Sequence, residues 1–230
     1  MNPCPDISES FLWMELPLTP YGEAAEMQRQ IVAAKKEKRL KKDAVLILEH
    51  PPIFTLGRNR GREHLMVSEK FLAEKNMQVV QTERGGNITF HGPGQLVVYP
   101  ILDMNAGHIG IREYVEGLEK IMSLTVREWG IDAHGDAQNR GLWIGNRKLG
   151  SIGVAVKHGI CFHGLALNVN MDLEPFTWIN PCGLCDIQMS TVEKESGKKI
   201  SVAQVRTVLK KHMAGFLKKQ AVDTDFQDLF

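Results

Sequence analysis

A glycine-rich segment near the middle of the chain also carries an arginine and a histidine. Residues 84–94 hold four glycines together with Arg84 and His91, and an apolar run with strand character follows at 96–101. Glycine lets another molecule approach the backbone, arginine is a permanently charged forked donor, and histidine titrates near neutral pH. Because such a loop is costly to order, it fits a binding site. The alternative is a tight hairpin in which Arg84 and His91 satisfy nearby carbonyl groups.

A cysteine and a lysine far apart in the sequence could together perform acyl transfer. Cys182 lies in an Asn-Pro-Cys-Gly segment at 180–183, and Lys148 follows a Gly-Asn turn at 145–146. A free thiol has a pKa of about 8.5, and a neighbouring ammonium group would stabilise the reactive thiolate. A partly desolvated lysine could conversely accept the thiol proton and return it later. The alternative is that Cys182 is a small buried apolar residue and Lys148 a solvated one.

Two other uses of the cysteines compete with acyl transfer. Cys161, His163, Cys182 and Cys185 would give the three thiolates and one imidazole of a structural zinc site. However, Cys161 and His163 are separated by a single residue, which is shorter than the usual two to four residues between zinc ligands. A redox pair of Cys182 and Cys185 lacks the thioredoxin-type context in which the motif opens a helix. We therefore expect no bound metal.

Several familiar catalytic motifs are absent from the sequence. There is no GxxxxGK(S/T) phosphate loop, no GxGxxG opening a helix after a strand, no HExxH and no GxSxG. The missing GxSxG argues against an α/β-hydrolase, and the other absences argue against the corresponding nucleotide-binding and zinc-protease sites.

The elements that must position these residues follow from hydrophobic periodicity and turn residues. Thr19-Pro20 is expected to cap a helix that runs to about residue 42, and Ser201 with Gln204 to form the capping box of the last helix. Further helices are expected near 68–75 and at 111–129. Strands are expected at 44–49, 53–57, 79–81, 96–101 and 160–168, and a hairpin at 142–156. Residues 1–18 are expected to be a short lead-in.

Composition and charge limit the classes of protein to which the chain can belong. The chain has 230 residues, of which 43% are hydrophobic, and a formal net charge of +1. This length supports one domain with a sizeable core, and the small net charge gives no field that favours nucleic acid or a membrane. No apolar run approaches the ~20 residues of a membrane span and no export signal is present, so we expect a cytoplasmic protein with reduced thiols. We expect one domain over 1–230, with a frayed acidic tail at 221–230.

The basic residues are unevenly distributed. Six of them lie at 35–42, offset only by Glu37. Such a run is usually the solvated C-terminal end of a helix, where cations complement the dipole. The alternative is a docking surface for an acidic partner protein.

Several motifs, in order along the chain, resemble those of the lipoyl(octanoyl) transferases. The glycine-rich segment reads RGGxxTFHGPGQxxxY over 84–99. It is preceded by LEHPPxxTLG at 48–57 and followed by KxxSIG at 148–153, HGLALNVN at 163–170 and NPCG at 180–183. The resemblance covers about residues 11–219, and several motifs in register are far more specific than any one of them.

The resemblance implies a fold, a reaction and a set of site residues. The implied fold is α/β of the α+β type, with mixed β-sheets flanked by helices, as in the catalytic domain of biotin and lipoate protein ligases. The implied reaction moves an octanoyl group from octanoyl-acyl carrier protein to one lysine of a lipoyl domain, the first step of endogenous protein lipoylation. In it, Cys182 forms a thioester and Lys148 shuttles protons. The implied substrate pocket is formed by Arg84, Gly85, Gly86, Asn87, Ile88, Thr89, Phe90, His91, Ser151, Ile152, Gly153, Gly164, Leu165 and Ala166.

The resemblance also implies the partners. The acceptors are lipoyl domains of 2-oxoacid dehydrogenase E2 subunits and the glycine cleavage H protein. The acyl donor is carried on phosphopantetheine, and neither ATP nor a metal is needed. Since both partners are acidic domains, the basic run at 35–42 gains a role as a docking surface. We expect a monomer that binds neither nucleic acid nor membrane. Cys185 departs from the family pattern, so a disulfide with Cys182 is an open alternative.

Two rival functions follow from the same residues. An ATP-dependent lipoate or biotin protein ligase of this fold would activate a free acid and has no need of a nucleophilic Cys182. Turnover with ATP and free acid, without carrier protein, would identify it. A non-catalytic, zinc-stabilised binding module is the rival of another class, and metal analysis of the purified chain would identify it.

Overall fold

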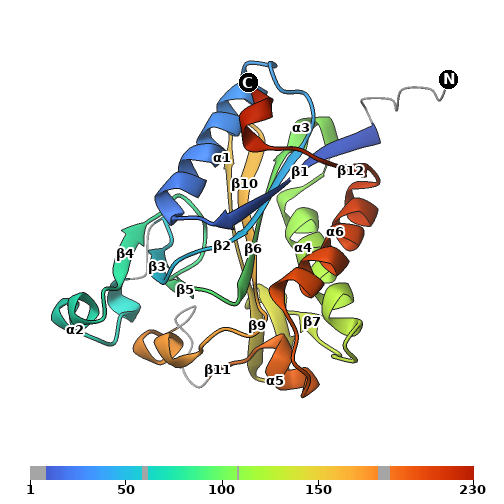
Figure 1. The fold of residues 1–230 in the computed structure, drawn as a ribbon. Helices are drawn as coiled ribbons and strands as arrows, with labels where there is room; N and C mark the ends of the chain where they lie inside the picture. The colour runs from blue at the N-terminus through green and yellow to red at the C-terminus, as the bar shows by residue number, and fades with distance from the viewer. Residues whose placement is uncertain (1–8, 59–61, 108, 181–186) are drawn as a thin grey trace.

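The computed structural model describes residues 9–58, 62–107, 109–180 and 187–230. These residues form two β-sheets with helices packed around them (Figure 1). The larger, nine-stranded sheet has the spatial order β12 (Gln220–Asp223), β1 (Ser10–Leu18), β2 (Ala44–Glu49), β6 (Gln95–Asp103), β10 (Ile160–Asn168), β9 (Arg147–Lys157), β8 (Gly141–Ile144) and β7 (His134–Gly135), and β11 (Gln188–Met189) pairs with β9. The smaller sheet has the order β4 (Gln78–Gln81), β3 (Ile53–Leu56) and β5 (Thr89–His91).

Helices connect and cover these strands. The α-helices are α1 (Tyr21–Lys36), α2 (Glu69–Glu74), α3 (Met104–Gly107), α4 (Ile111–Arg127), α5 (Val192–Ser196) and α6 (Val202–Leu217). Short 3-10 turns are η2 (Arg62–His64), η3 (Glu174–Trp178) and η5 (Phe226–Leu229). None of the described helices has both the length and the apolar character required to span a lipid bilayer.

The central strands of the large sheet are covered on both faces, which explains why β2, β6 and β10 are mostly apolar. Along β1, Phe11 and Trp13 join the core cluster beneath α4 and α6, whereas Leu12 and Met14 join the cluster beneath α1. Figure 1 shows α1 on one side of the sheet and α4 with α6 on the other. The sheet is mixed, since β1 is parallel to β2 and β12, whereas β2, β6, β10 and β9 pair in antiparallel order. The prediction of mixed sheets flanked by helices is therefore confirmed.

The small sheet forms a separate cluster beside the large one. Phe54, Phe90, Phe176 and Trp178 pack together there, with ring centroids 5.1–6.3 Å apart for the pairs in contact. The prolines at 51–52 end β2, and the chain then enters β3, as the sequence predicted. β5 carries residues 89–91 of the glycine-rich segment, and a turn at 92–94 then leads from the small sheet into β6 of the large one.

Several local predictions are confirmed. The capping box of α6 forms, with Ser201 and Gln204 bonded reciprocally. β8 and β9 form the expected hairpin around Gly145, whose φ is 54°. Helix α4 is followed by Gly130 at φ 76°, the left-handed conformation that glycine adopts most readily.

Predictions for the two ends of the chain and for the cap of α1 are wrong. The lead-in contains β1, which pairs with β2 and β12. The tail expected to be frayed, 221–230, instead completes β12 and forms η5, whose Phe226 and Leu229 pack against the core. Thr19 does not cap α1, because its hydroxyl donates to the Pro17 carbonyl and Pro20 is the N-cap residue.

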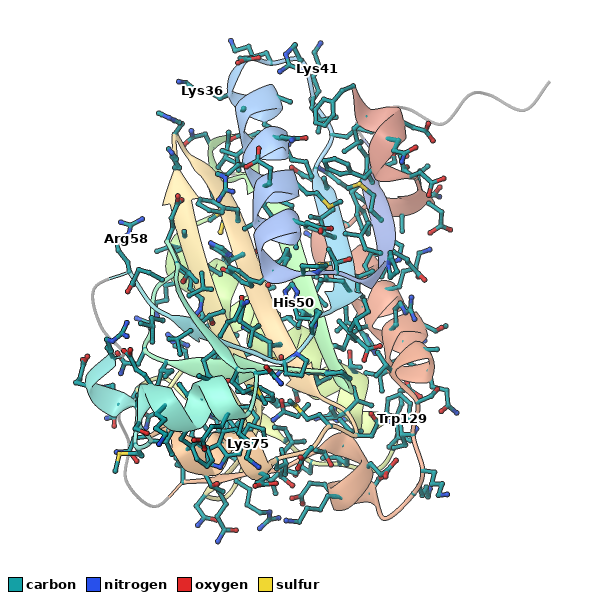
Figure 2. All side chains as sticks on the ribbon, turned by 60° about the vertical axis from the view of Figure 1, so that its left-hand side comes forward. Lys36, Lys41, His50, Arg58, Lys75 and Trp129 are labelled. Carbon is teal, nitrogen blue, oxygen red and sulfur yellow. The ribbon has the colours of Figure 1, made fainter. Side chains whose placement is uncertain are left out.

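The prediction that the first helix runs to about residue 42 is also wrong, because α1 ends before the basic run does. It stops at Lys36, and the chain turns at Lys38, whose φ is 60°. Lys35 is buried and ion-paired with Asp43 at 3.1 Å, so it does not belong to the solvated group that the sequence suggested. Figure 2 shows Lys36 and Lys41 at the opposite end of α1 from His50.

Candidate active site

A cavity opens between the glycine-rich segment, β9 and β10. Its empty space, which includes the solvent at its open mouth, is about 530 Å³. The first residue of α1, Tyr21, closes one side. The lining residues are Tyr21, Arg84, Gly86, Asn87, Ile88, Thr89, His91, Val97, Tyr99, Lys148, Ser151, Ile152, Gly153, His163, Gly164, Leu165 and Ala166.

The structure brings most of the predicted pocket residues to this cavity. There are two exceptions. Gly85 lines hollows on the outer surface of the same loop, and Phe90 packs its ring against Phe54 and Phe176 in the small sheet's cluster. The lining positions agree with a substrate pocket, while binding itself stays a prediction.

The Arg84 side chain is held by hydrogen bonds to Thr55 of β3 and to the adjacent Gly85. Its side chain donates to the carbonyl of Thr55 at 2.7 Å, to the hydroxyl of Thr55 at 2.8 Å and to the carbonyl of Gly85 at 3.0 Å. The carbonyl contacts match the hairpin alternative raised from the sequence. The same guanidinium also lines the cavity, so the two readings are compatible in the folded chain.

His91 is fixed in one tautomer by a chain of hydrogen bonds. Gln95 donates its amide to the Phe90 carbonyl at 3.1 Å and to Asn168 Oδ1 at 2.9 Å, so its oxygen faces His91 Nδ1 at 2.6 Å. Nδ1 must therefore carry the proton, and Nε2 accepts from Thr55 Oγ1 at 3.3 Å. Burial, and secondly the nearby His50, lower the pKa of His91 to about 3.

His50 and Tyr99 form a second buried pair beside the cavity. His50 Nδ1 donates to the Thr19 carbonyl at 2.7 Å, which leaves Nε2 to accept from Tyr99 Oη at 2.8 Å. Burial lowers the pKa of His50 to about 4 and raises the pKa of Tyr99 well above its usual value. Both groups are neutral at neutral pH.

His163 enters the cavity from an irregular point of β10. Its φ is 56°, and its backbone N–H donates to Gln28 Oε1 at 2.8 Å instead of to a neighbouring strand. Burial, and secondly the charge of Arg84, lower its pKa to about 3. Its Nε2 is buried and has no hydrogen-bond partner among the described residues. The imidazole ring also packs against Tyr99, with centroids 6.0 Å apart.

Lys148, predicted as the proton shuttle, lies at the start of β9 and lines the cavity. Its side chain is fully buried, its Nζ donates to the Arg140 carbonyl at 3.2 Å, and the same atom lies 4.7 Å from the centroid of the Trp143 ring. The sequence alternative of a solvated lysine is therefore wrong. A buried primary amine next to a cavity is suited to exchanging a proton with a bound group.

The predicted nucleophile, Cys182, and its neighbour Cys185 lie outside the described residues. The described chain resumes at residue 187, and its first strand, β11, pairs with β9, which carries Lys148. Met189 of β11 is the register partner of Lys148, and Ser190 N donates to the Lys148 carbonyl at 2.9 Å.

Of the four residues of the alternative zinc site, the structure describes only Cys161 and His163. Within 9–58, 62–107, 109–180 and 187–230, no three His, Cys, Asp or Glu side chains form a group suited to a metal. Cys161 is buried in the core cluster below α4, and burial raises the pKa of its thiol to about 12. His163, two residues later, faces the cavity instead.

Four lining residues were not among the predicted site residues. Tyr21 and Val97 carry no sequence signal, because only the packing of α1 and β6 brings them to the cavity. Tyr99 and His163 do stand in the motifs at 84–99 and 163–170, which was the available signal. These four residues add apolar surface and neutral hydrogen-bonding groups to a wall that also carries Arg84 and Lys148, and this combination suits an alkyl chain with a polar end.

Comparison with known proteins gives consistent results. A family model described as the lipoyl protein ligase A/B catalytic domain matches residues 20–214. An octanoyltransferase of Desulfotalea psychrophila is 43% identical over 199 residues, which are 86% of this chain and 89% of that protein. An octanoyltransferase of Maridesulfovibrio salexigens is 38% identical over 210 residues, which are 91% and 98% of the two chains.

Among solved structures, a putative lipoate protein ligase of Thermoplasma acidophilum is similar. The TM-score is 0.71 at 15% identity, over 96% of this chain and 92% of that one. At this identity the likeness concerns the fold alone.

Proposed function

We propose the function of this chain from one premise: it belongs to the lipoyl protein ligase A/B catalytic domain family. Its relatives of 38–43% identity over most of their length are octanoyltransferases, and the chain is accordingly an acyltransferase that moves an octanoyl group in protein lipoylation. The proposal extends to the donor, the covalent intermediate and the acceptor. The donor is octanoyl-acyl carrier protein, the intermediate a thioester on Cys182, and the acceptor one lysine of a lipoyl domain.

The observation that carries the proposal is the position of a fully buried Lys148 on the wall of an otherwise largely apolar cavity. The six methylenes of an octanoyl chain would contribute about 5 kcal/mol if fully buried there. The histidines around the cavity are neutral at neutral pH, so they do not oppose an apolar chain with charge.

The first half-reaction transfers the acyl group to the enzyme. Cys182 Sγ attacks the carrier thioester carbonyl, and its proton passes to Lys148 Nζ. The tetrahedral intermediate collapses, the carrier thiolate leaves, and Lys148 returns the proton to it. Backbone N–H groups of the glycine-rich segment are suited to stabilise the oxyanion.

The second half-reaction forms the amide. The neutral amine of the acceptor lysine attacks the Cys182 thioester, and Lys148 takes the proton that the amine loses. The Cys182 thiolate leaves and recovers that proton. The scheme is ping-pong and consumes no ATP.

Intact-mass spectrometry after incubation with octanoyl-acyl carrier protein tests the proposal. The wild-type chain should gain the mass of one octanoyl group, and Cys182→Ser should gain none. Cys185→Ser is the matched control, since it removes a thiol three residues away and should still be acylated. Lys148→Met should be acylated at a greatly reduced rate. Full transfer to a lipoyl domain by Cys182→Ser would overturn the proposal.

The likeness of fold to a lipoate protein ligase supports one rival, an ATP-dependent ligase. Such an enzyme would modify a lipoyl domain when given ATP and free octanoic acid without carrier protein. The proposed transferase should give no product under these conditions.

A further inference from the structure

The buried carboxylate of Glu119, on α4, is connected to Lys148 through one intervening residue, Arg140. Glu119 is only 6% exposed, and its two oxygens bind two successive residues. Oε2 accepts from the Arg140 guanidinium at 3.0 Å, and Oε1 accepts from the Gly141 backbone N–H at 3.0 Å. The carbonyl of the same Arg140 accepts from Lys148 Nζ at 3.2 Å. A continuous chain of contacts therefore joins α4 to the cavity lysine.

The corner at 140–141 is packed directly against the lysine side chain. Gly141 has φ 142°, and a Cβ at this position would lie 2.4 Å from the Gly150 carbonyl oxygen and 2.8 Å from Lys148 Cε. The register of β8 and β9 also shifts here, with Leu142 opposite Gly150 and Trp143 opposite Lys148. Such a bulge re-aims the side chains beside it, so the position of the corner decides where Lys148 points.

Burying a carboxylate costs free energy unless an opposite charge and hydrogen-bond donors compensate for the lost water. Here Arg140 supplies the opposite charge and Gly141 supplies a backbone donor. The lysine stem has four flexible carbons, so a fixed carbonyl partner limits where its amine can lie.

We propose that Glu119 is the positioning residue of Lys148: it fixes the 140–141 corner and thereby the carbonyl that holds Lys148 Nζ at the cavity wall. The inference rests on the proposed role of Lys148 as the partner of the Cys182 thiol. Glu119 is not among the residues that line the cavity, and it acts only through the corner.

The test is the pH dependence of Cys182 alkylation by iodoacetamide, followed at the Cys182 peptide by mass spectrometry. Lys148→Met should raise the pH midpoint of alkylation, because it removes the ammonium group that would stabilise the Cys182 thiolate. Below the midpoint, each unit by which the thiol pKa rises lowers the thiolate fraction about tenfold. Glu119→Gln keeps the side-chain size but places an amide against Arg140, and should raise the midpoint in the same direction. In octanoyl transfer it should lower kcat by roughly ten- to a hundredfold, by analogy with the loss of groups that orient metal ligands, and leave KM unchanged.

Non-additivity separates positioning from general loss of structure. In the Lys148→Met background, Glu119→Gln should change neither the midpoint nor the rate further. Glu116→Gln is the matched control, since Glu116 lies nearly one turn earlier on α4, contacts Arg140 at 3.5 Å and makes no bond to Gly141. It should behave like the wild-type chain. If Glu119→Gln does not fold, Arg140→Met, which leaves the Gly141 bond in place, should give a smaller shift in the same direction.

Two results would overturn the inference, and they are distinguishable from failure of the proposed function. Equal effects of Glu119→Gln with and without Lys148, or equal effects of the Glu116 and Glu119 variants, would show that Glu119 does not act through the lysine. An unchanged midpoint in Lys148→Met would remove the proposed proton shuttle itself, and with it the basis for the inference.

Discussion

At the scale of single residues, the site is built from histidines that the fold keeps uncharged. Burial is the main cause in each case, lowering the pKa of His50 to about 4 and those of His91 and His163 to about 3. In the unfolded chain a histidine titrates near pH 6.5, so between roughly pH 3 and 6.5 the unfolded state binds more protons than the folded state. Their contribution to stability is thus complete above about pH 6.5 and is lost as the pH falls through this window.

Replacing His163 should weaken this pH dependence. Asparagine tolerates the left-handed backbone of this position, where φ is 56°, so His163→Asn removes the titrating group without a backbone conflict. The slope of unfolding free energy against pH should fall by up to about 1.4 kcal/mol per pH unit between pH 4 and 6, measured by urea unfolding. His158→Asn is the matched control, because His158 has φ 55° but is exposed. An equal loss of slope in both variants would contradict the assignment.

At the scale of elements, the cavity depends on how closely β10 approaches β6. Gly164 lies in β10 with the cavity beside it, and a Cβ there would meet the Val98 carbonyl oxygen at 2.3 Å and Pro100 Cδ at 2.6 Å. Both atoms belong to β6, in the centre of the buried sheet. Neither is the mobile end of a long side chain, so an added methyl group must displace a strand.

Gly164→Ala should therefore destabilise the fold by about 1–3 kcal/mol or more, as overpacking of a core does. Gly22→Ala is the control: Gly22 lies in α1, where an added Cβ would have no neighbouring atom within 4 Å, and alanine there should be neutral or stabilising by up to ~1 kcal/mol. Chemical denaturation of the two variants measures the difference. Similar unfolding midpoints would show that β10 can move away from β6 at little cost.

The elements that sequence reasoning found are those with a local signal. The Ser201 and Gln204 pair lies within one turn, so α6 could be located from its cap, and Gly145 identified the hairpin that carries Lys148. By contrast, β1 and β12 pair Ser10 with Gln220, across almost the whole chain. β1 is also buried on both faces near its start, which removes the alternation that marks a half-buried strand.

The residues of the site likewise divide into those that have a signal in the sequence and those that do not. The motif at 84–99 and Lys148 could be placed from the resemblance, but Tyr21 reaches the cavity only because α1 packs against β6 and β10. Glu119 had no signal at all, since its partners Arg140 and Gly141 lie about twenty residues later and its role depends on a bulge. Contacts made through tertiary structure leave no trace in periodicity.

At the scale of the whole molecule, the basic turn and the cavity lie at opposite ends of α1. Tyr21 begins the helix at the cavity and Lys36 is its last residue, and this 16-residue helix is ~24 Å long. The buried Lys35 is paired with Asp43, so a docking surface there would consist of exposed residues such as Lys36, Lys38 and Lys41. Figure 2 shows Lys36 and Lys41 projecting from this end of the molecule.

If an acidic acyl carrier docks on this turn, the triple variant Lys36→Glu, Lys38→Glu and Lys41→Glu should raise its KM on the order of tenfold at low salt, since each exposed pair contributes ~0.2–1 kcal/mol. The effect should shrink as ionic strength rises, because salt screens exposed charges. kcat should be unchanged, because the turn is remote from Lys148. The control reverses three other exposed lysines, Lys194, Lys198 and Lys199, which changes the net charge equally. A rise in KM for both triple variants would indicate a general field, and an unchanged KM in the first would place the carrier on another face of the molecule.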